Sequence, residues 1–155
     1  MNTFEKLIRD IQSGTGVSRS QAAKELGKLG DKRAVDYLIQ ALKDENGSVR
    51  SNAAFSLAEL EEKKAVPALM GALQDTEVWV RKSAAKALGL LHATEAVKPL
   101  KQLLEDPSST VRKNAVRSLG QIGGPEALEG LSRAASDQDP LVAGMAKEAI
   151  EKLKS

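Results

Sequence analysis

Arginine and aspartate recur along this chain at one fixed step, and they are the first residues whose spacing could support chemistry. Each series advances by 31 residues. The members are Arg19, Arg50, Arg81 and Arg112 in one series and Asp44, Asp75, Asp106 and Asp137 in the other. Three of the arginines follow an aspartate by six residues. An acid near a cation can form either a reactive site or a structural ion pair, and we favour the structural role.

Other reactive side chains are scarce. The chain has one histidine, His92, and no cysteine. The lack of cysteine excludes disulfides, thiolate ligands and a cysteine nucleophile, and one histidine cannot complete a zinc or iron ligand set. His92 falls at the end of a predicted helix, where it can meet the helix dipole, and Glu61-Glu62 falls in a solvated turn. We therefore predict no catalytic residue, no metal site and no cofactor, and we expect that the protein is not an enzyme.

The segment Ser13-Gly14-Thr15-Gly16 is a further candidate, because glycine-rich turns can cradle phosphate. It lacks the spacing of a P-loop and the lysine-serine ending of that motif. Because other parts of the chain carry ordinary turns at the equivalent place, we predict a plain connection between helices.

The composition is that of a helical protein with nearly balanced charge. The chain is 155 residues long, 41% hydrophobic and 28% charged, with a net charge of +2. That balance does not require a polyanionic partner. The first residues lack the apolar run of a signal peptide, and no stretch approaches the roughly 18 apolar residues of a membrane span. We expect a cytoplasmic protein that does not enter membranes.

The same step of 31 residues relates the apolar positions, so the charged residues belong to a repeat. One such series is Leu26, Leu57, Leu88, Leu119 and Ile150. The register continues without insertion and predicts one domain, 1–155, made of five units: 1–30, 31–61, 62–92, 93–123 and 124–155.

Each unit contains two helical patterns. In the third unit, Pro67 is tolerable only in a first turn, which predicts that the first helix begins near Lys64. Apolar residues at spacings of three and four then form two buried stripes. These are Val66, Leu69, Met70 and Leu73 on the first helix and Val80, Ala84, Leu88 and Leu91 on the second. A hairpin of this size cannot bury both stripes alone, so we predict an all-α solenoid, an α-α superhelix, in which each unit stacks on the next.

The repeat resembles a known family. The pattern Ala-Val-x-x-Leu…Leu-x-Asp-x-x-x-x-Val-Arg-x-x-Ala-Ala-x-Ala-Leu-Gly, which is clearest over 65–89, resembles HEAT repeats, above all the short type named after the phycobilisome lyases. The resemblance covers the whole chain and is weakest in the end units, where Ser18 replaces the valine and Ala143 replaces the arginine. Terminal units of a stack have one face in water, so we expect the end units to be caps of a complete array.

The resemblance implies roles for the charged series. It implies a ladder in which each arginine bonds the aspartate of its own or the adjacent unit. Some HEAT-like enzymes bind iron through paired His-Glu motifs, and because this chain has none, we exclude a likeness to hydroxylases of that kind. The resemblance also implies that the second helices line a concave face.

The expected binding site lies on positions of that face which the repeat pattern leaves free. It carries seven cations and two acids, a net charge of +5 that leaves −3 for the rest of the chain. The candidate partner-binding residues are Lys24, Phe55, Val78, Trp79, Lys82, Lys86, Leu90, Lys113 and Arg117. We expect a monomer that binds a protein or peptide of acidic character there. A bilin-lyase-related subunit acting in chromophore attachment and a nucleic-acid-binding protein remain alternatives, the last disfavoured because the lysines are sparse.

Overall fold

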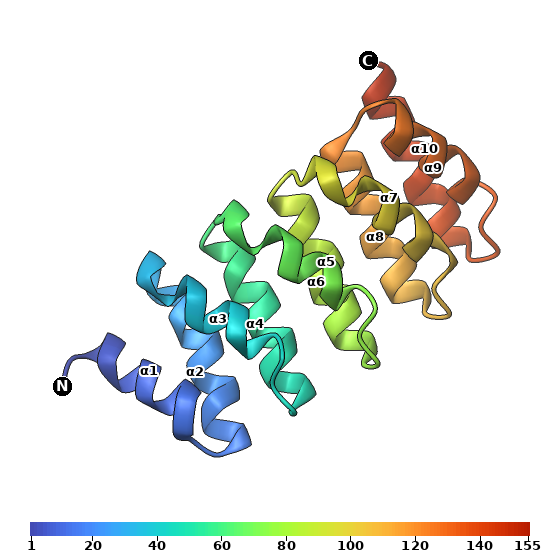
Figure 1. Cartoon of the computed structure of the whole chain (residues 1–155). Coiled ribbons are helices and arrows are strands. Elements are labelled where there is room, and N and C mark those ends of the chain that lie inside the picture. Colours follow the sequence, from blue (N-terminus) through green and yellow to red (C-terminus); the bar gives the residue numbers. More distant parts are fainter.

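The computed structural model describes residues 1–155, and every regular element in it is a helix (Figure 1). The first helices of the successive pairs are α1 (Thr3–Ser13), α3 (Val35–Ala41), α5 (Val66–Ala72), α7 (Val97–Gln102) and α9 (Pro125–Ala134). The second helices are α2 (Gly16–Leu29), α4 (Gly47–Glu59), α6 (Val78–Leu90), α8 (Ser109–Ile122) and α10 (Pro140–Lys154). Short 3-10 turns precede α3, α5 and α7 at Lys32–Ala34, Lys63–Ala65 and Thr94–Ala96, and another follows α7 at Leu103–Glu105.

The helices form two layers with unequal contact. Each second helix packs along its length against the second helix of the neighbouring unit, whereas the first helices mainly touch the second helix of their own unit. The stack therefore runs from α1 to α10 as one row of helix pairs, as Figure 1 shows. This confirms the predicted α-solenoid of five two-helix repeats. The unit boundaries themselves remain a proposal drawn from the 31-residue register.

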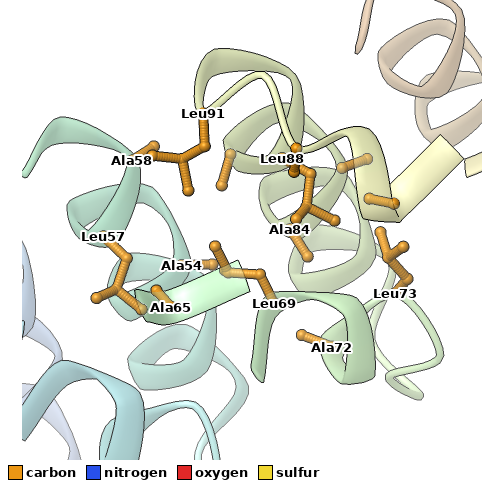
Figure 2. Packing of buried hydrophobic residues seen from close by; sticks show 14 of the residues in the cluster. Ala54, Leu57, Ala58, Ala65, Leu69, Ala72, Leu73, Ala84, Leu88 and Leu91 are labelled. Carbon is orange, nitrogen blue, oxygen red and sulfur yellow. The ribbon is translucent and has the colours of Figure 1, made fainter. Parts of the chain in front are cut away.

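The core follows the repeat position by position. Leu26, Leu57, Leu88 and Leu119 are all 0% exposed. Figure 2 shows Leu57 and Leu88 with Leu69, which comes from the intervening first helix, and all three are 0% exposed. One continuous cluster of buried apolar side chains results, and burying them is the main favourable term for the stack.

Close approach of the second helices explains two glycines. A Cβ added at Gly27 would lie 2.4 Å from Ser56 Oγ, and one at Gly89 would lie 2.3 Å from Ser118 Oγ. The buried Ser56 hydroxyl donates to the carbonyl of Ala23 at 2.6 Å. Any side chain in place of these glycines would separate adjacent second helices.

The ends of the helices differ slightly from expectation. The α-helical part of the third unit begins at Val66, two residues beyond Lys64, because a 3-10 turn over Lys63–Ala65 precedes it. The second helices end at an equivalent position with positive φ in four units: Gly30 (71°), Glu61 (55°), His92 (49°) and Gly123 (73°). His92 thus occupies a position that favours glycine.

Candidate functional site

The arginine series joins neighbouring units through one recurring geometry. In Arg50, Nε donates to Asp75 Oδ2 at 2.8 Å and Nη2 donates to Asp75 Oδ1 at 3.0 Å. The remaining amino group, Nη1, donates to the backbone carbonyl of Asp44 in its own unit at 2.8 Å. One guanidinium therefore holds both the carboxylate of the next unit and the turn that precedes its own helix. Such two-pronged contact is a strong form of charge-assisted hydrogen bond.

The same contact recurs three more times. The Nε to Oδ2 distances are 2.7 Å for Arg19–Asp44, 2.8 Å for Arg81–Asp106 and 2.9 Å for Arg112–Asp137. In the fifth unit Ala143 stands in place of the arginine, so no guanidinium reaches back to the turn at Asp137. The ladder thus joins each unit to the next at four successive boundaries.

Each aspartate of the ladder also shapes the start of a second helix. Asp75 Oδ1 accepts the backbone N–H of Glu77 at 2.9 Å, and Asp44 Oδ1 accepts that of Asn46 at 2.8 Å. Burial alone would raise the pKa of both carboxyls. The hydrogen bonds from Arg50 and Arg19 and from these backbone groups outweigh it, so the pKa of Asp75 and of Asp44 is lowered. Both carboxylates stay ionised and are engaged by hydrogen bonds, which suits a structural role rather than proton transfer.

Opposite the first helices lies the surface that we call the second-helix face. It is formed by residues 17, 20, 24 and 28 of α2 and by the equivalents of these residues, at steps of 31, on α4, α6, α8 and α10. Five of the seven exposed large apolar side chains of the protein lie on this face. They are Val17 (82%), Leu141 (65%), Trp79 (63%), Leu90 (45%) and Phe55 (41%). Large apolar side chains that are exposed together on one face of a protein are a mark of interaction sites.

The two aromatic rings of the face are each covered by a lysine. Lys82 Nζ lies 5.0 Å from the centroid of the Trp79 ring, and Lys86 Nζ lies 5.2 Å from that of Phe55. Both distances are within the range of a cation–π contact. Lys86 and Phe55 occupy the same repeat position on adjacent helices, so the second pair crosses from α6 to α4.

The remaining candidate residues are placed less uniformly. Lys24 and Arg117 are exposed and Lys113 is half-buried, all on the second-helix face. Val78 is half-buried and packs against the core cluster, which removes it from the open surface. Val17 and Leu141 share the repeat position of Trp79 and lie among the free positions of the second helices, and both are exposed although they are not among the candidate partner-binding residues.

Two hollows open on this face. One, of about 560 Å³, lies between α2, α4 and the start of α6, and Trp79 is its single hydrophobic lining residue beside Ser48, Ser51, Asn52 and Glu77. The other, of about 390 Å³, lies between α8 and α10. The apolar side chains that line it are Val116, Met145 and Ala149, with Arg117 and Glu148 among its charged lining residues. The second-helix face thus combines exposed aromatic rings with recesses.

No three His, Asp or Glu side chains are grouped so that they could hold a metal ion. His92 is exposed, and its Nδ1 lies 3.1 Å from the carbonyl of Gln121. None of the helices combines the length and apolar character that crossing a membrane requires.

Comparison with known proteins identifies the relatives of this arrangement. A sequence profile described as HEAT repeats matches residues 5–88 and 71–151. No curated protein sequence gives a significant match. Among solved structures, the complex of CpcE and CpcF of phycocyanin lyase from Nostoc sp. PCC7120 is similar with a TM-score of 0.87 and 30% identity. The match covers 99% of this chain and 65% of that chain, so this protein spans less than two thirds of the lyase chain.

More distant structures share the fold alone. A designed armadillo repeat protein in complex with the peptide (KR)4 matches with a TM-score of 0.74 at 20% identity, over 97% of this chain and 81% of that one. Human deoxyhypusine hydroxylase matches with a TM-score of 0.59 at 18% identity, over 97% of this chain and 73% of that one. The likeness to the hydroxylase extends to the fold alone, because stacking of helix pairs does not depend on histidine motifs.

Proposed function

This chain belongs to the family of HEAT-repeat proteins, and on that premise we propose that it is a non-enzymatic interaction module. Its second-helix face is the concave surface and binds a protein or peptide. Trp79 and Phe55 are the apolar anchors, and Lys24, Lys82, Lys86, Lys113 and Arg117 select a partner of acidic character.

The concentration of exposed apolar side chains on one face is the observation that carries this proposal. Trp79 is 63% exposed, although contact of its large apolar ring with water is unfavourable in free energy. A stack of this kind buries its core with the positions shared by every unit. The exposed side chains fall on the positions that stacking does not use, which leaves them free for a partner.

Complexes of similar proteins support the proposal. The designed armadillo repeat protein is seen with a peptide that alternates lysine and arginine. CpcE and CpcF are seen in complex with each other. Because the second-helix face of this protein carries an excess of cations, we infer a partner of the opposite charge to that basic peptide.

Recovery of partners from native extract tests the proposal. The variants are Trp79→Ala and the double change Lys82→Glu/Lys86→Glu, both on the second-helix face. Matched controls are Leu29→Ala, an exposed leucine outside that face, and Lys43→Glu/Lys98→Glu, two exposed lysines outside it. We expect the first two variants to lose the partners that the controls retain. Equal recovery by all four would remove the second-helix face as the site.

A role related to bilin lyases is the second candidate, and the similarity to the CpcE and CpcF complex favours it. In this alternative the protein is a subunit that assists chromophore attachment. Trp79 fluorescence should then change when a linear tetrapyrrole is added, since the ring lies beside the larger hollow of the face. An unchanged spectrum at high tetrapyrrole concentration would count against this alternative.

A further inference from the structure

We propose that the partner presents an acidic amphipathic helix, and that this helix lies along α6 between Trp79 and Leu90. This inference rests on the proposed function and specifies the chemistry and shape of what the second-helix face binds. Four features of the face support it: its unpaired charges, the spacing of its apolar side chains, the state of its polar groups, and the lysines that cover its rings.

The unpaired charges call for an acidic partner. Lys82 and Lys86 on α6, with Lys113 and Arg117 on α8, form no ion pair with any acidic side chain of the protein. Of the other cations on the face, Lys28 pairs with Glu25 at 3.6 Å and Lys152 with Glu148 at 3.5 Å, whereas Lys24 on α2 is also unpaired. Four free cations on two adjacent helices create a local positive potential that carboxylates of a partner would neutralise.

The apolar side chains set the length of the contact. Trp79 and Leu90 are eleven residues apart on α6, with Lys82 and Lys86 between them on the same stripe. At about 1.5 Å per residue the two apolar ends are roughly 16 Å apart, or three helical turns. A helix laid along α6 would match this stripe with apolar residues eleven apart and two acidic residues between them.

The polar groups of the face favour a helix over an extended peptide. An extended peptide needs partners for its backbone N–H and C=O groups, whereas a helix satisfies most of its own. Four polar side chains of α2, α4 and α6 that could serve are already engaged: Ser51 and Ser83 share a hydrogen bond of 2.9 Å, and Asn52 Nδ2 donates to Ser20 Oγ at 2.8 Å. One buried side-chain atom, Asn114 Oδ1, lacks a partner, and a single acceptor cannot hold an extended backbone.

Lys82 and Lys86 cover the two aromatic rings of the face and can move away from them when a partner binds. In the unbound protein Lys82 lies over Trp79 and Lys86 over Phe55. When carboxylates of the partner attract the two ammonium groups, the lysines leave the rings, and the rings become available to apolar side chains. Binding therefore exchanges a cation for an apolar group beside the Trp79 indole, a change that its fluorescence reports directly.

A synthetic helix tests the proposal. The probe is an alanine-rich peptide of about four helical turns with two leucines eleven residues apart and a glutamate four residues inside each leucine. One control peptide has lysine in place of both glutamates, and another has a proline between the glutamates, which breaks the helix while keeping the charge. Binding is followed by Trp79 fluorescence and by the circular dichroism of the peptide.

The expected result has four parts. The glutamate peptide binds and gains helicity, the lysine peptide does not bind, and Lys82→Glu/Lys86→Glu raises the Kd of the glutamate peptide at least about tenfold, which is about 1.4 kcal/mol. The lysine peptide should bind that double variant instead. Equal binding by the proline peptide would show that the partner does not bind as a helix, although the second-helix face would remain the binding site. Failure of every peptide, with Trp79-dependent recovery of a native partner intact, would overturn this inference alone. Tighter binding of a DNA duplex than of the glutamate peptide, weakening steeply with salt, would overturn it in favour of nucleic acid.

Discussion

Arg81 and Asp106 are joined across a repeat boundary by two hydrogen bonds, Nε to Oδ2 at 2.8 Å and Nη2 to Oδ1 at 3.2 Å. The side chain of Arg81 is 14% exposed and that of Asp106 is 6% exposed. The same guanidinium donates through Nη1 to the carbonyl of Asp75 in its own unit. The contact therefore connects two units at the place where their second helices begin.

Removing one member of this pair should be costly. Because the other charge stays buried and unpaired, we expect Arg81→Ala to lower the free energy of unfolding by about 3 kcal/mol. Replacing both members, as Arg81→Met/Asp106→Leu, should cost less than the single change. The control is Lys64→Ala, which breaks an exposed pair with Asp36 and should cost under about 1 kcal/mol. Urea unfolding measures all three, and equal costs for Arg81→Ala and Lys64→Ala would contradict a supporting role for the ladder.

Acid should weaken the ladder. The lowered pKa of Asp44 and of Asp75 means that both carboxyls hold their protons less tightly when folded than when unfolded. Their contribution to stability is therefore fully present above the unfolded pKa of about 3.9 and is lost as pH falls through the folded pKa. The urea midpoint should decline below about pH 4, and Asp75→Asn should flatten that decline. A midpoint in wild-type protein that stays level down to pH 3 would count against the ion pairs.

Overpacking between second helices should destabilise the stack. Ala84 is 0% exposed in the layer where α4, α6 and α8 meet. We expect Ala84→Phe to cost roughly 1–3 kcal/mol or more, because the added ring forces neighbouring helices apart. Lys98→Phe, at an exposed position of α7, provides a control with the same added ring. A thermal melt of Ala84→Phe that matches wild type would show that the assigned register is wrong.

Relieving a strained backbone should stabilise the protein. Glu61 lies two residues beyond the end of α4 and has a φ of 55°, at a position where two other units carry glycine. A left-handed conformation costs a non-glycine residue about 1–2 kcal/mol, and glycine loses part of that gain through its freedom when unfolded. We expect Glu61→Gly to stabilise by about 0.5 kcal/mol, whereas Glu61→Ala should not stabilise. Lower stability of Glu61→Gly in urea unfolding would contradict this explanation of the helix end.

Much of the fold could be predicted because one period governs it. The step of 31 residues places Leu57 and Leu88 in equivalent surroundings, and both are fully buried. The same step identifies the free positions of the second helices. The sequence did not settle whether each arginine bonds the aspartate of its own unit or that of the adjacent unit. In the structure the arginine side chain makes two contacts: it donates to the carboxylate of the next unit and to a backbone carbonyl of its own unit.

The details of the second-helix face lay beyond the sequence. That Lys86 covers Phe55 on another helix depends on side-chain conformations and on the offset between α4 and α6, which periodicity does not specify. Val78 looked equivalent to the open positions, yet it packs against the core. The hydrogen bond between Ser51 and Ser83 also appears only when the helices are assembled.

Lysine labelling with and without a partner tests the central claim most directly. The partner would be a protein recovered from native extract, and the reactivity of each lysine would be read by mass spectrometry. If the second-helix face is the binding surface, Lys82, Lys86 and Lys113 should become protected while Lys43 and Lys98, which lie outside it, keep their reactivity. Protection of Lys43 and Lys98 with no change at Lys82 and Lys86 would place the partner on the opposite side and contradict the account.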